Sequence, residues 1–440
     1  MMNNFLVVAY YFPPSGGPGV QRVLKHIKYI RQFGWQPIVL TVENGQFPAR
    51  DESLIAEIPE DVIVRRTKIY EPYDIYRFFT GKKPGTPIDV NTIKKEDQSL
   101  NFKERISEFI RATFFIPDAR IGWLLTAKKE ALKIINEYNC KAIYSSSPPY
   151  TCSLIARYAK RKTNLPWVAG LRDPWTGFIS APKRWFLPAI IDRSLEKSVF
   201  EESNFVECAW EGIIKDAFNK YPSLDKDKFI HVPNGFDSED FPDVDYKRNE
   251  KFTLTYTGSM YGRRNPLALL TAIEKLLSDN KISANDFKLK FIGRFGNEVL
   301  EMFDNCSFKQ NIEIIGYIPH KDSIAHLMTS DALLLVVDES KESEEIVPGK
   351  VYEYIGVQRP ILAIAPTNGA IARLIYDTNS GKVAHQTEIS TISDIFLGFI
   401  NLWKSNSTII NPNLELIQQF ERKNAAKKLA ELLNSVTTLT

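Results

Sequence analysis

The sequence predicts an α/β protein built from two consecutive domains of strand–helix–strand units. Short apolar runs without alternation recur along the chain, separated by segments with helical spacing, which is typical of strands buried in a parallel sheet. Several of these runs end in turns rich in glycine or proline. The chain has 440 residues, which is long for one hydrophobic core. We therefore expect a first domain over 1–240, a second over 250–415 and a C-terminal helical segment over 416–440.

The charge of the chain is unevenly distributed. Residues 1–200 contain 30 Lys and Arg against 19 Asp and Glu, whereas residues 201–440 contain 26 against 34. The basic residues are scattered and no recognition module for nucleic acid stands out, so we expect no nucleic-acid partner. An anionic lipid surface or a lipid-linked diphosphate fits the basic half better.

Cysteines and histidines show no metal-binding pattern. The four cysteines contain no C-x-x-C pair and the five histidines lack ligand spacing, so we expect no metal and a reduced, cytoplasmic setting. The first apolar run has no Lys or Arg before it and ends at Pro13 and Pro14, which predicts a strand and not a signal peptide. No run approaches the ~20 apolar residues that span a bilayer, so any membrane contact is expected to be peripheral.

A glycine-rich turn joins the first strand, expected at 4–11, to a helix that ends at Gly34 and a second strand at 36–42. Gly16 and Gly17 lie in this turn, where the absence of a Cβ lets backbone amides approach a ligand. A plain turn is the alternative. Further elements are expected as helices at 126–138, 151–162, 183–202 and 211–219, and as strands at 141–145, 167–171, 204–207 and 229–232.

Polar residues follow two strands of the first domain at their carboxyl ends, where ligands bind in open α/β sheets. Ser147 follows the strand at 141–145, and Arg172, Asp173 and Trp175 follow the strand at 167–171. We treat Ser147, Arg172 and Trp175 as candidates for binding an acceptor, and Asp173 as a candidate catalytic carboxylate. A structural ion pair between Arg172 and Asp173 is the alternative.

Residues 70–120 interrupt the alternation of strands and helices. Residues 87–100 are polar and predict a mobile loop. Residues 102–115 predict an amphipathic helix with an aromatic stripe and nearby arginines. This stripe either packs on the core of its own domain or docks on an anionic membrane surface.

The second domain follows an acidic linker at 237–245 and opens with a strand at 253–257 and a helix at 267–277. The turn between them contains Gly258, Ser259, Arg263 and Arg264. Cations at a helix N-terminus after a glycine turn favour binding of a phosphate, with plain surface charge as the alternative. Strands are also expected at 288–292, 312–315, 330–337 and 360–365, the last followed by a turn at Asn368 and Gly369.

A charged stretch separates the strand at 330–337 from a helix that begins near Gly349. Backbone amides at Gly349 and Val351, together with Lys350, favour an anion at this helix N-terminus. Glu353, one turn further on, is suited to accept hydrogen bonds from a ribose. Two solvated glutamates, Glu345 and Glu353, are the alternative reading of the spacing.

The spacing Glu345-x7-Glu353 resembles the signature of retaining glycosyltransferases of family 4, which have the GT-B fold. The segments Tyr11–Arg22, Trp167–Trp175 and Pro233–Asp237 are similar to the branch that builds bacterial surface polysaccharides. The resemblance implies two Rossmann-like domains that face each other across a cleft, with the C-terminal helix returning to the first domain.

The resemblance also implies a metal-independent transfer of a sugar from a UDP- or GDP-linked donor to a glycan or lipid-linked acceptor, peripherally at the inner face of the cytoplasmic membrane. In this scheme Arg264 and Lys350 stabilise the leaving diphosphate, Glu345 orients a sugar hydroxyl and Glu353 binds the ribose. Gly16, Gly17, Asn368 and Gly369 would lie near the donor.

The chain departs from the family pattern at two places. Ser259 stands where relatives often have an arginine, and the histidine that many relatives carry near Arg172 and Asp173 is absent. An inactive homologue or partner subunit, a two-domain sugar receptor and a sugar-nucleotide 2-epimerase of the same fold are therefore the alternatives.

Overall fold

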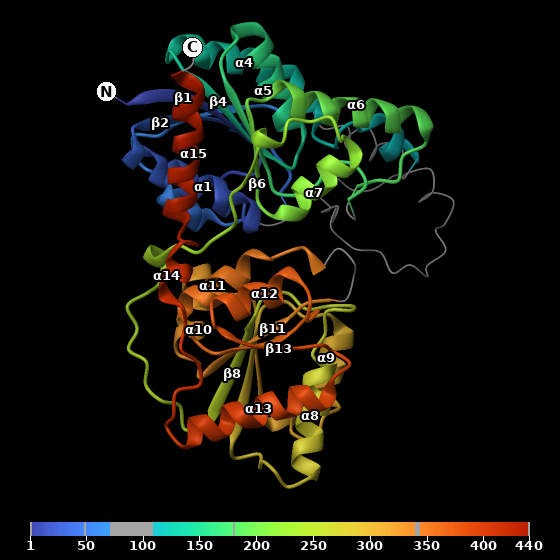
Figure 1. Ribbon diagram of the computed structural model, residues 1–440, viewed down its shortest axis with the longest axis vertical. Coiled ribbons are helices and arrows are strands. Elements are labelled where there is room, and N and C mark those ends of the chain that lie inside the picture. Colours follow the sequence, from blue (N-terminus) through green and yellow to red (C-terminus); the bar gives the residue numbers. More distant parts are fainter. Residues whose placement is uncertain (1, 48–49, 71–108, 179–180, 339–343, 439–440) are drawn as a thin grey trace. The chain divides into compact units, whose positions relative to one another are not determined.

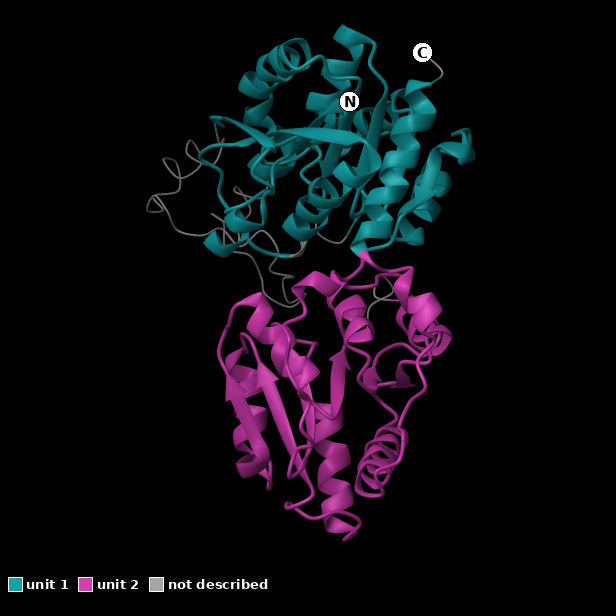
Figure 2. Ribbon diagram, turned by 90° about the vertical axis from the view of Figure 1, so that its left-hand side faces the viewer, with its two compact units in different colours: residues 1–234, 422–440 teal, residues 235–421 magenta. Residues whose placement is uncertain are grey.

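The computed structural model describes residues 2–47, 50–70, 109–178, 181–338 and 344–438 (Figure 1). The chain forms two compact units (Figure 2). Unit 1 comprises residues 1–234 and 422–440, and unit 2 comprises residues 235–421.

Unit 1 is built on a seven-stranded parallel sheet with the strand order β3-β2-β1-β4-β5-β6-β7. Its central strands are buried on both faces, which explains their continuous apolar runs. The strands are β1 (Asn3–Ala9), β2 (Trp35–Val42), β3 (Ile63–Thr67), β4 (Ala142–Ser147), β5 (Trp167–Leu171), β6 (Phe205–Cys208) and β7 (Phe229–His231). The helices are α1 (Pro18–Ile30), α4 (Leu124–Glu137), α5 (Thr151–Thr163), α6 (Phe186–Glu202), α7 (Glu211–Lys220) and α15 (Arg422–Thr437).

The C-terminal helix belongs to the core of unit 1. Helix α15 packs against α1, and the two helices lie side by side in Figure 1. Leu429 and Leu433 of α15 are buried with Val20 and Leu24 of α1 in one apolar cluster. The predicted return of the C-terminal helix to the first domain is confirmed.

Unit 2 is built on a six-stranded parallel sheet with the order β10-β9-β8-β11-β12-β13. One apolar cluster joins a face of the sheet to α8, α9 and α13, and a second joins the other face to α10, α11 and α12. The strands are β8 (Phe252–Thr257), β9 (Phe287–Ile292), β10 (Ile312–Ile315), β11 (Ala332–Val336), β12 (Ile361–Ile364) and β13 (Gly381–Ala384). The helices are α8 (Leu267–Ser278), α9 (Asn297–Asp304), α10 (His320–Met328), α11 (Gly349–Val357), α12 (Ala370–Asp377), α13 (Ile389–Lys404) and α14 (Leu414–Gln418).

Two strands that the sequence did not predict lie at sheet edges. β3 contains Arg65 and Arg66, and β13 has only four residues with an exposed Lys382, so neither shows a continuous apolar run. The predicted loop at 87–100 and the first part of the predicted helix at 102–115 lie outside the described residues. Residues 109–114 are helical. Within the described ranges, no helix combines the length and apolarity that crossing a membrane requires.

Candidate functional site

The strongest candidate site in unit 2 is a pair of cations at the carboxyl edge of the sheet. Lys350 lies in the first turn of α11, with Nζ 3.4 Å from the carbonyl oxygen of Thr257 and 4.1 Å from the ring centroid of Tyr256. Burial, followed by the charge of Arg264, lowers the pKa of Lys350 well below its ordinary value, while Glu353 acts in the opposite direction. Two cations brought together in a partly desolvated place create a strong preference for an anion.

Arg264 has a hydrogen-bond donor without an acceptor. Its Nε is buried and finds no partner among the described residues. An unsatisfied buried donor costs about 1–3 kcal/mol, so it marks a place where a ligand oxygen would be stabilising. The neighbouring Arg263 is exposed and lies 4.0 Å from the carboxylate of Asp338. Arg264, and not Arg263, is therefore the arginine of this turn that accompanies Lys350.

The turn after β8 is held by a close approach of two backbone segments. A Cβ on Gly293, which has a φ of 141°, would lie 2.1 Å from the carbonyl oxygen of Gly258. The Gly258 amide already donates to Ile292, and the carbonyl of Ser259 accepts from Tyr256 Oη at 2.9 Å. The Gly258 amide is thus not available to a ligand, and the contribution of this glycine is room beside Lys350 Nζ.

The N-terminus of α11 offers fewer ligand contacts than predicted. Val351 is buried in the core and its amide donates to the carbonyl of Pro348 at 3.0 Å, so the prediction that Val351 binds the donor is wrong. Helix geometry leaves the amides of Gly349 and Lys350 without intrahelical acceptors, and no side chain caps them. These two amides and the Lys350 ammonium remain as the anion-binding groups of this helix.

Glu345 lies in the loop that leads into α11 and is half-buried. The turn before α12 packs against this loop, because a Cβ on Gly369 would lie 3.0 Å from the carbonyl oxygen of Glu344. The amide of Gly369 donates to Pro366, whereas Asn368 is exposed. The fold therefore brings the turn at 366–369 next to the loop that carries Glu345.

In unit 1, the glycine turn lies at the N-terminus of α1, directly above Arg172. Gly17 precedes α1 with a φ of 98°, which favours glycine, and it follows the half-buried Gly16. A Cβ on Gly19 would lie 3.3 Å from Arg172 Nη2. Arg172 donates to Ser146 Oγ at 2.6 Å and to the carbonyl of Pro148. Arg172 therefore links the turn to the end of β4.

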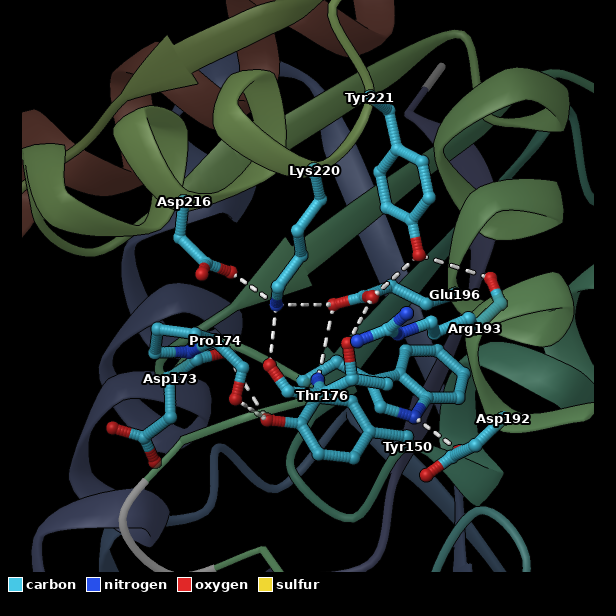
Figure 3. Close-up of polar contacts among 11 residues, drawn as sticks. Tyr150, Asp173, Pro174, Thr176, Asp192, Arg193, Glu196, Asp216, Lys220 and Tyr221 are labelled. Atoms are coloured by element: carbon cyan, nitrogen blue, oxygen red, sulfur yellow. Dashed lines mark hydrogen bonds and ion pairs between the residues drawn. The ribbon is translucent and has the colours of Figure 1, made fainter. Parts of the chain in front are cut away.

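Asp173 presents a carboxylate without a recorded hydrogen bond or ion pair among the described residues. In Figure 3 its carboxylate has no partner, while its carbonyl accepts from Tyr150 Oη at 3.2 Å. Burial raises the pKa of Asp173 and the charge of Arg172 partly offsets that rise. The alternative in which Arg172 and Asp173 form a direct ion pair is not what the structure shows.

Two of the predicted acceptor-side residues are turned inward. Trp175 is 2% exposed, stacks on Tyr150 with a centroid distance of 4.4 Å and donates to Asp192 at 2.8 Å. Ser147 is fully buried, with its Oγ 2.8 Å from Ser153 Oγ. Neither side chain is placed to touch an acceptor, so this prediction is corrected for both. The strand end was identified from the sequence, but the side-chain direction was not.

The sequence gave no sign of a buried polar network that supports the segment carrying Asp173. Glu196 is fully buried and accepts from Thr176 N at 3.1 Å, Thr176 Oγ at 2.6 Å and Tyr221 Oη at 2.8 Å (Figure 3). Lys220 Nζ lies 3.3 Å from Glu196. The network connects α6 and α7 to residues 173–176. A glutamate inside an otherwise ordinary helix gives no such signal in one sequence.

No family model matches the chain, and no curated protein matches its sequence. Solved structures do match it. A glycosyltransferase from Rickettsia africae ESF-5 is 14% identical with a TM-score of 0.62, over 99% of this chain and 98% of that chain. WaaG, a glycosyltransferase involved in lipopolysaccharide biosynthesis, is 13% identical with a TM-score of 0.56, over 98% and 99%. TarM from S. aureus, solved with UDP among its ligands, is 10% identical with a TM-score of 0.57, over 98% and 100%.

These likenesses extend over both units and concern the fold. Two parallel-sheet α/β units with seven and six strands, matched over nearly the full chain, have the GT-B fold of the solved glycosyltransferases.

Proposed function

We propose that this chain is a retaining glycosyltransferase of family 4 that moves a sugar from a UDP- or GDP-linked donor to a hydroxyl of a glycan or lipid-linked acceptor in surface-polysaccharide synthesis. The observation that carries the proposal is the convergence of Lys350 and Arg264 at the N-terminus of α11, with Arg264 Nε lacking an acceptor among the described residues. The likeness to glycosyltransferase structures supports it.

The cations supply the chemistry of the leaving group. As the bond between sugar and phosphate breaks, negative charge grows on the diphosphate, and fixed positive groups stabilise that charge without reorganising. Lys350, Arg264 and the first amides of α11 take the place that a divalent cation has in other transferases. Glu353 accepts from the ribose and Glu345 orients a hydroxyl of the transferred sugar. The departing phosphate oxygen takes the proton of the attacking hydroxyl on the same face.

We assign acceptor binding to unit 1. The carboxylate of Asp173 and the glycine turn at Gly16 and Gly17 lie at the carboxyl edge of its sheet, where α/β sheets bind ligands. Asp173 has the chemistry to accept a hydrogen bond from an acceptor hydroxyl, because an ionised carboxylate has free acceptor positions.

The proposal is tested by calorimetric binding of UDP, GDP and ADP to the whole chain, followed by the Arg264→Ala variant. We expect one of the first two nucleotides to bind, and Arg264→Ala to weaken binding by about tenfold or more, since a charge-assisted hydrogen bond contributes roughly 1.5–3 kcal/mol. Arg263→Ala is the matched control and should bind nearly as the parent does. Equal affinity in the Arg264→Ala and parent proteins would remove Arg264 from the site.

Product analysis separates transfer from the alternatives. A transferase converts the nucleotide sugar slowly by hydrolysis and rapidly when an acceptor is added, with the product keeping the anomeric configuration of the donor. A 2-epimerase changes the sugar without an acceptor, and an inactive homologue leaves it unchanged. Full activity after EDTA treatment is the expected result for a metal-independent enzyme.

The membrane contact predicted for 102–115 belongs to the same proposal. In the described part of this segment Phe109 and Phe114 are exposed, and Thr113 accepts from Trp185 Nε1 at 2.9 Å, which joins the segment to the start of α6. The start of α6 adds further exposed apolar side chains: Trp185, Phe186, Leu187, Ile190 and Ile191. Lys183 and Arg193 flank this patch and are exposed, whereas Asp192 and Glu196 are buried.

An apolar patch with basic residues beside it and acidic residues turned inward fits an anionic membrane surface. Phe186→Asp should therefore reduce sedimentation with phosphatidylglycerol vesicles severalfold and have little effect with neutral phosphatidylcholine vesicles, which should bind weakly in any case. Leu267→Asp, which changes an exposed leucine of unit 2, is the control. Equal losses in the two variants would contradict a contact through this patch.

A further inference from the structure

The carboxylate expected to bind ribose has a partner on a neighbouring helix. His320 is the first residue of α10, which packs against α11, and its Nε2 lies 3.0 Å from Glu353 Oε1. The side chains of His320 and Glu353 are 30% and 23% exposed. The pair is therefore supported by two packed helices and still accessible to a ligand.

The donor in this contact follows from the chemistry of the two groups. An ionised carboxylate only accepts hydrogen bonds, so Nε2 of His320 carries the proton that is shared with Glu353 Oε1. Among the described residues, Glu353 Oε2 receives no hydrogen bond. One oxygen of the carboxylate is thus held by the protein, and the other keeps its acceptor positions.

Glu353 also has a fixed relation to the cationic site. Lys350 and Glu353 are three residues apart on α11, so they lie on the same face of the helix about 4.5 Å apart along its axis. A ribose whose 5′ phosphate is bound at Lys350 extends over a comparable distance. Its vicinal hydroxyls then come to the level of Glu353.

We propose that His320 is a positioning residue for the ribose of a nucleoside diphosphate. By donating to Oε1 it fixes the orientation of the Glu353 side chain and directs Oε2 to the 2′ and 3′ hydroxyls, which donate to it. A glutamate without this support would have to lose rotamer freedom when the ligand binds. This inference rests on the proposed function, since the ribose is brought to Glu353 by the diphosphate bound at Lys350 and Arg264.

The inference is tested by comparing ribose recognition with phosphate recognition in the same variants. Calorimetry gives the dissociation constants of UDP and GDP, of their 2′,3′-dideoxy forms and of inorganic pyrophosphate. For the better of the two bases, we expect the parent protein to prefer the ribonucleotide by about tenfold or more, as hydrogen bonds to a charged group do.

Three substitutions distinguish positioning from a general structural effect. His320→Phe keeps an aromatic ring without a donor and should reduce the ribose preference to about twofold, with pyrophosphate affinity unchanged. His320→Gln can place an amide N–H near the position of Nε2 and should restore most of the preference. His385→Phe is the control, because the His385 ring contacts Thr387 at 2.7 Å, away from this helix pair.

Each other outcome has a definite meaning. If His320→Phe keeps the ribose preference of the parent, or if His320→Gln behaves like His320→Phe, the positioning role is wrong. If pyrophosphate affinity falls together with ribose preference, His320 only holds the two helices together and the inference is also wrong. If the parent binds neither nucleotides nor pyrophosphate, the proposed function itself fails, and this result is distinct from the others.

Discussion

The Lys350 ammonium is subject to two opposing effects. Burial and the nearby charge of Arg264 lower its pKa, whereas Glu353 favours the charged form. Folding therefore costs free energy at Lys350 wherever the unfolded chain would be protonated, and stability contributed by this group rises with pH between the lowered pKa and the ordinary value of about 10.4. A bound diphosphate reverses the effect, because it stabilises the charged ammonium.

The lowered pKa predicts proton uptake when a diphosphate binds. Above the pKa of Lys350 in the free protein, UDP or pyrophosphate must bring a proton onto the amine, so the affinity should fall as the pH rises. Calorimetry at pH 9 in two buffers with different ionisation enthalpies measures this uptake. Lys350→Arg should retain affinity within about tenfold and show no uptake, since arginine stays charged. Identical heats for the parent in both buffers would contradict the role given to Lys350.

Lys350 and Arg264 could be predicted together because of where their segments begin. They are far apart in sequence, yet Arg264 follows β8 and Lys350 follows β11, and these strands are neighbours in the sheet. Parallel strands end at the same edge, so residues in the following turns meet. The pairing of His320 with Glu353 could not be predicted in this way, because it depends on how α10 packs against α11.

At the scale of elements, a buried network fixes α1 to the sheet of unit 1. Arg22 of α1 forms an ion pair with Glu207 of β6, and Glu207 also accepts from Tyr144 Oη of β4 at 2.8 Å. His26 Nε2 lies 3.1 Å from Glu207, and burial lowers the pKa of His26. Arg22 further donates to the carbonyl of Val232 at 2.8 Å. One helix is thereby held against three other segments of the unit.

This network predicts a specific loss of stability in acid. Burial alone would raise the pKa of Glu207, but the charges of Arg22 and His26 and the hydrogen bonds outweigh it and lower the pKa to about 2. A depressed carboxylate stabilises the fold above the unfolded pKa and loses that contribution as the pH falls from about 4.5 to about 2, which amounts to about 3 kcal/mol.

Urea unfolding of unit 1, followed at several values of pH, measures this effect. Glu207→Gln should be less stable at pH 7 and should show a smaller dependence on pH below 4.5 than the parent. Glu137→Gln is the control, because Glu137 pairs with Arg65 at the surface, where ion pairs contribute little. The same pH dependence in the Glu207→Gln and parent proteins would show that another group is responsible.

The elements of the fold differ in how clearly the sequence marks them. β5 and β10 were predicted with their observed bounds, because each is a buried run between turn residues. The edge strands β3 and β13 were missed, since an edge strand needs fewer apolar residues. The inward orientation of Ser147 and Trp175 depends on packing against α5 and α6, which the local sequence does not specify.

At the scale of the whole molecule, the chain is arranged so that unit 2 is continuous and unit 1 is not. Residues 235–421 form unit 2 as one segment, whereas unit 1 needs residues 422–440 from the other end of the chain. Trp35 Nε1 of β2 donates to Asn434 of α15 at 2.9 Å, and the apolar face of α15 completes the cluster around α1. The stability of the two units should therefore respond separately to changes in α15.

Leu433→Ala tests this separation. Leu433 is fully buried in the cluster of unit 1, so its truncation should reduce the stability of that unit by about 2–5 kcal/mol through lost contacts and a cavity. Hydrogen exchange should show increased opening in α1 and β1 and unchanged protection in β8, β9 and β11. Leu402→Ala, which changes a partly exposed leucine of α13, is the control and should alter neither pattern. Because the diphosphate site is built from residues of unit 2, Leu433→Ala should also bind UDP or GDP with the affinity of the parent. Loss of nucleotide binding in Leu433→Ala under conditions where β8 and β11 stay protected would mean that unit 1 contributes directly to donor binding.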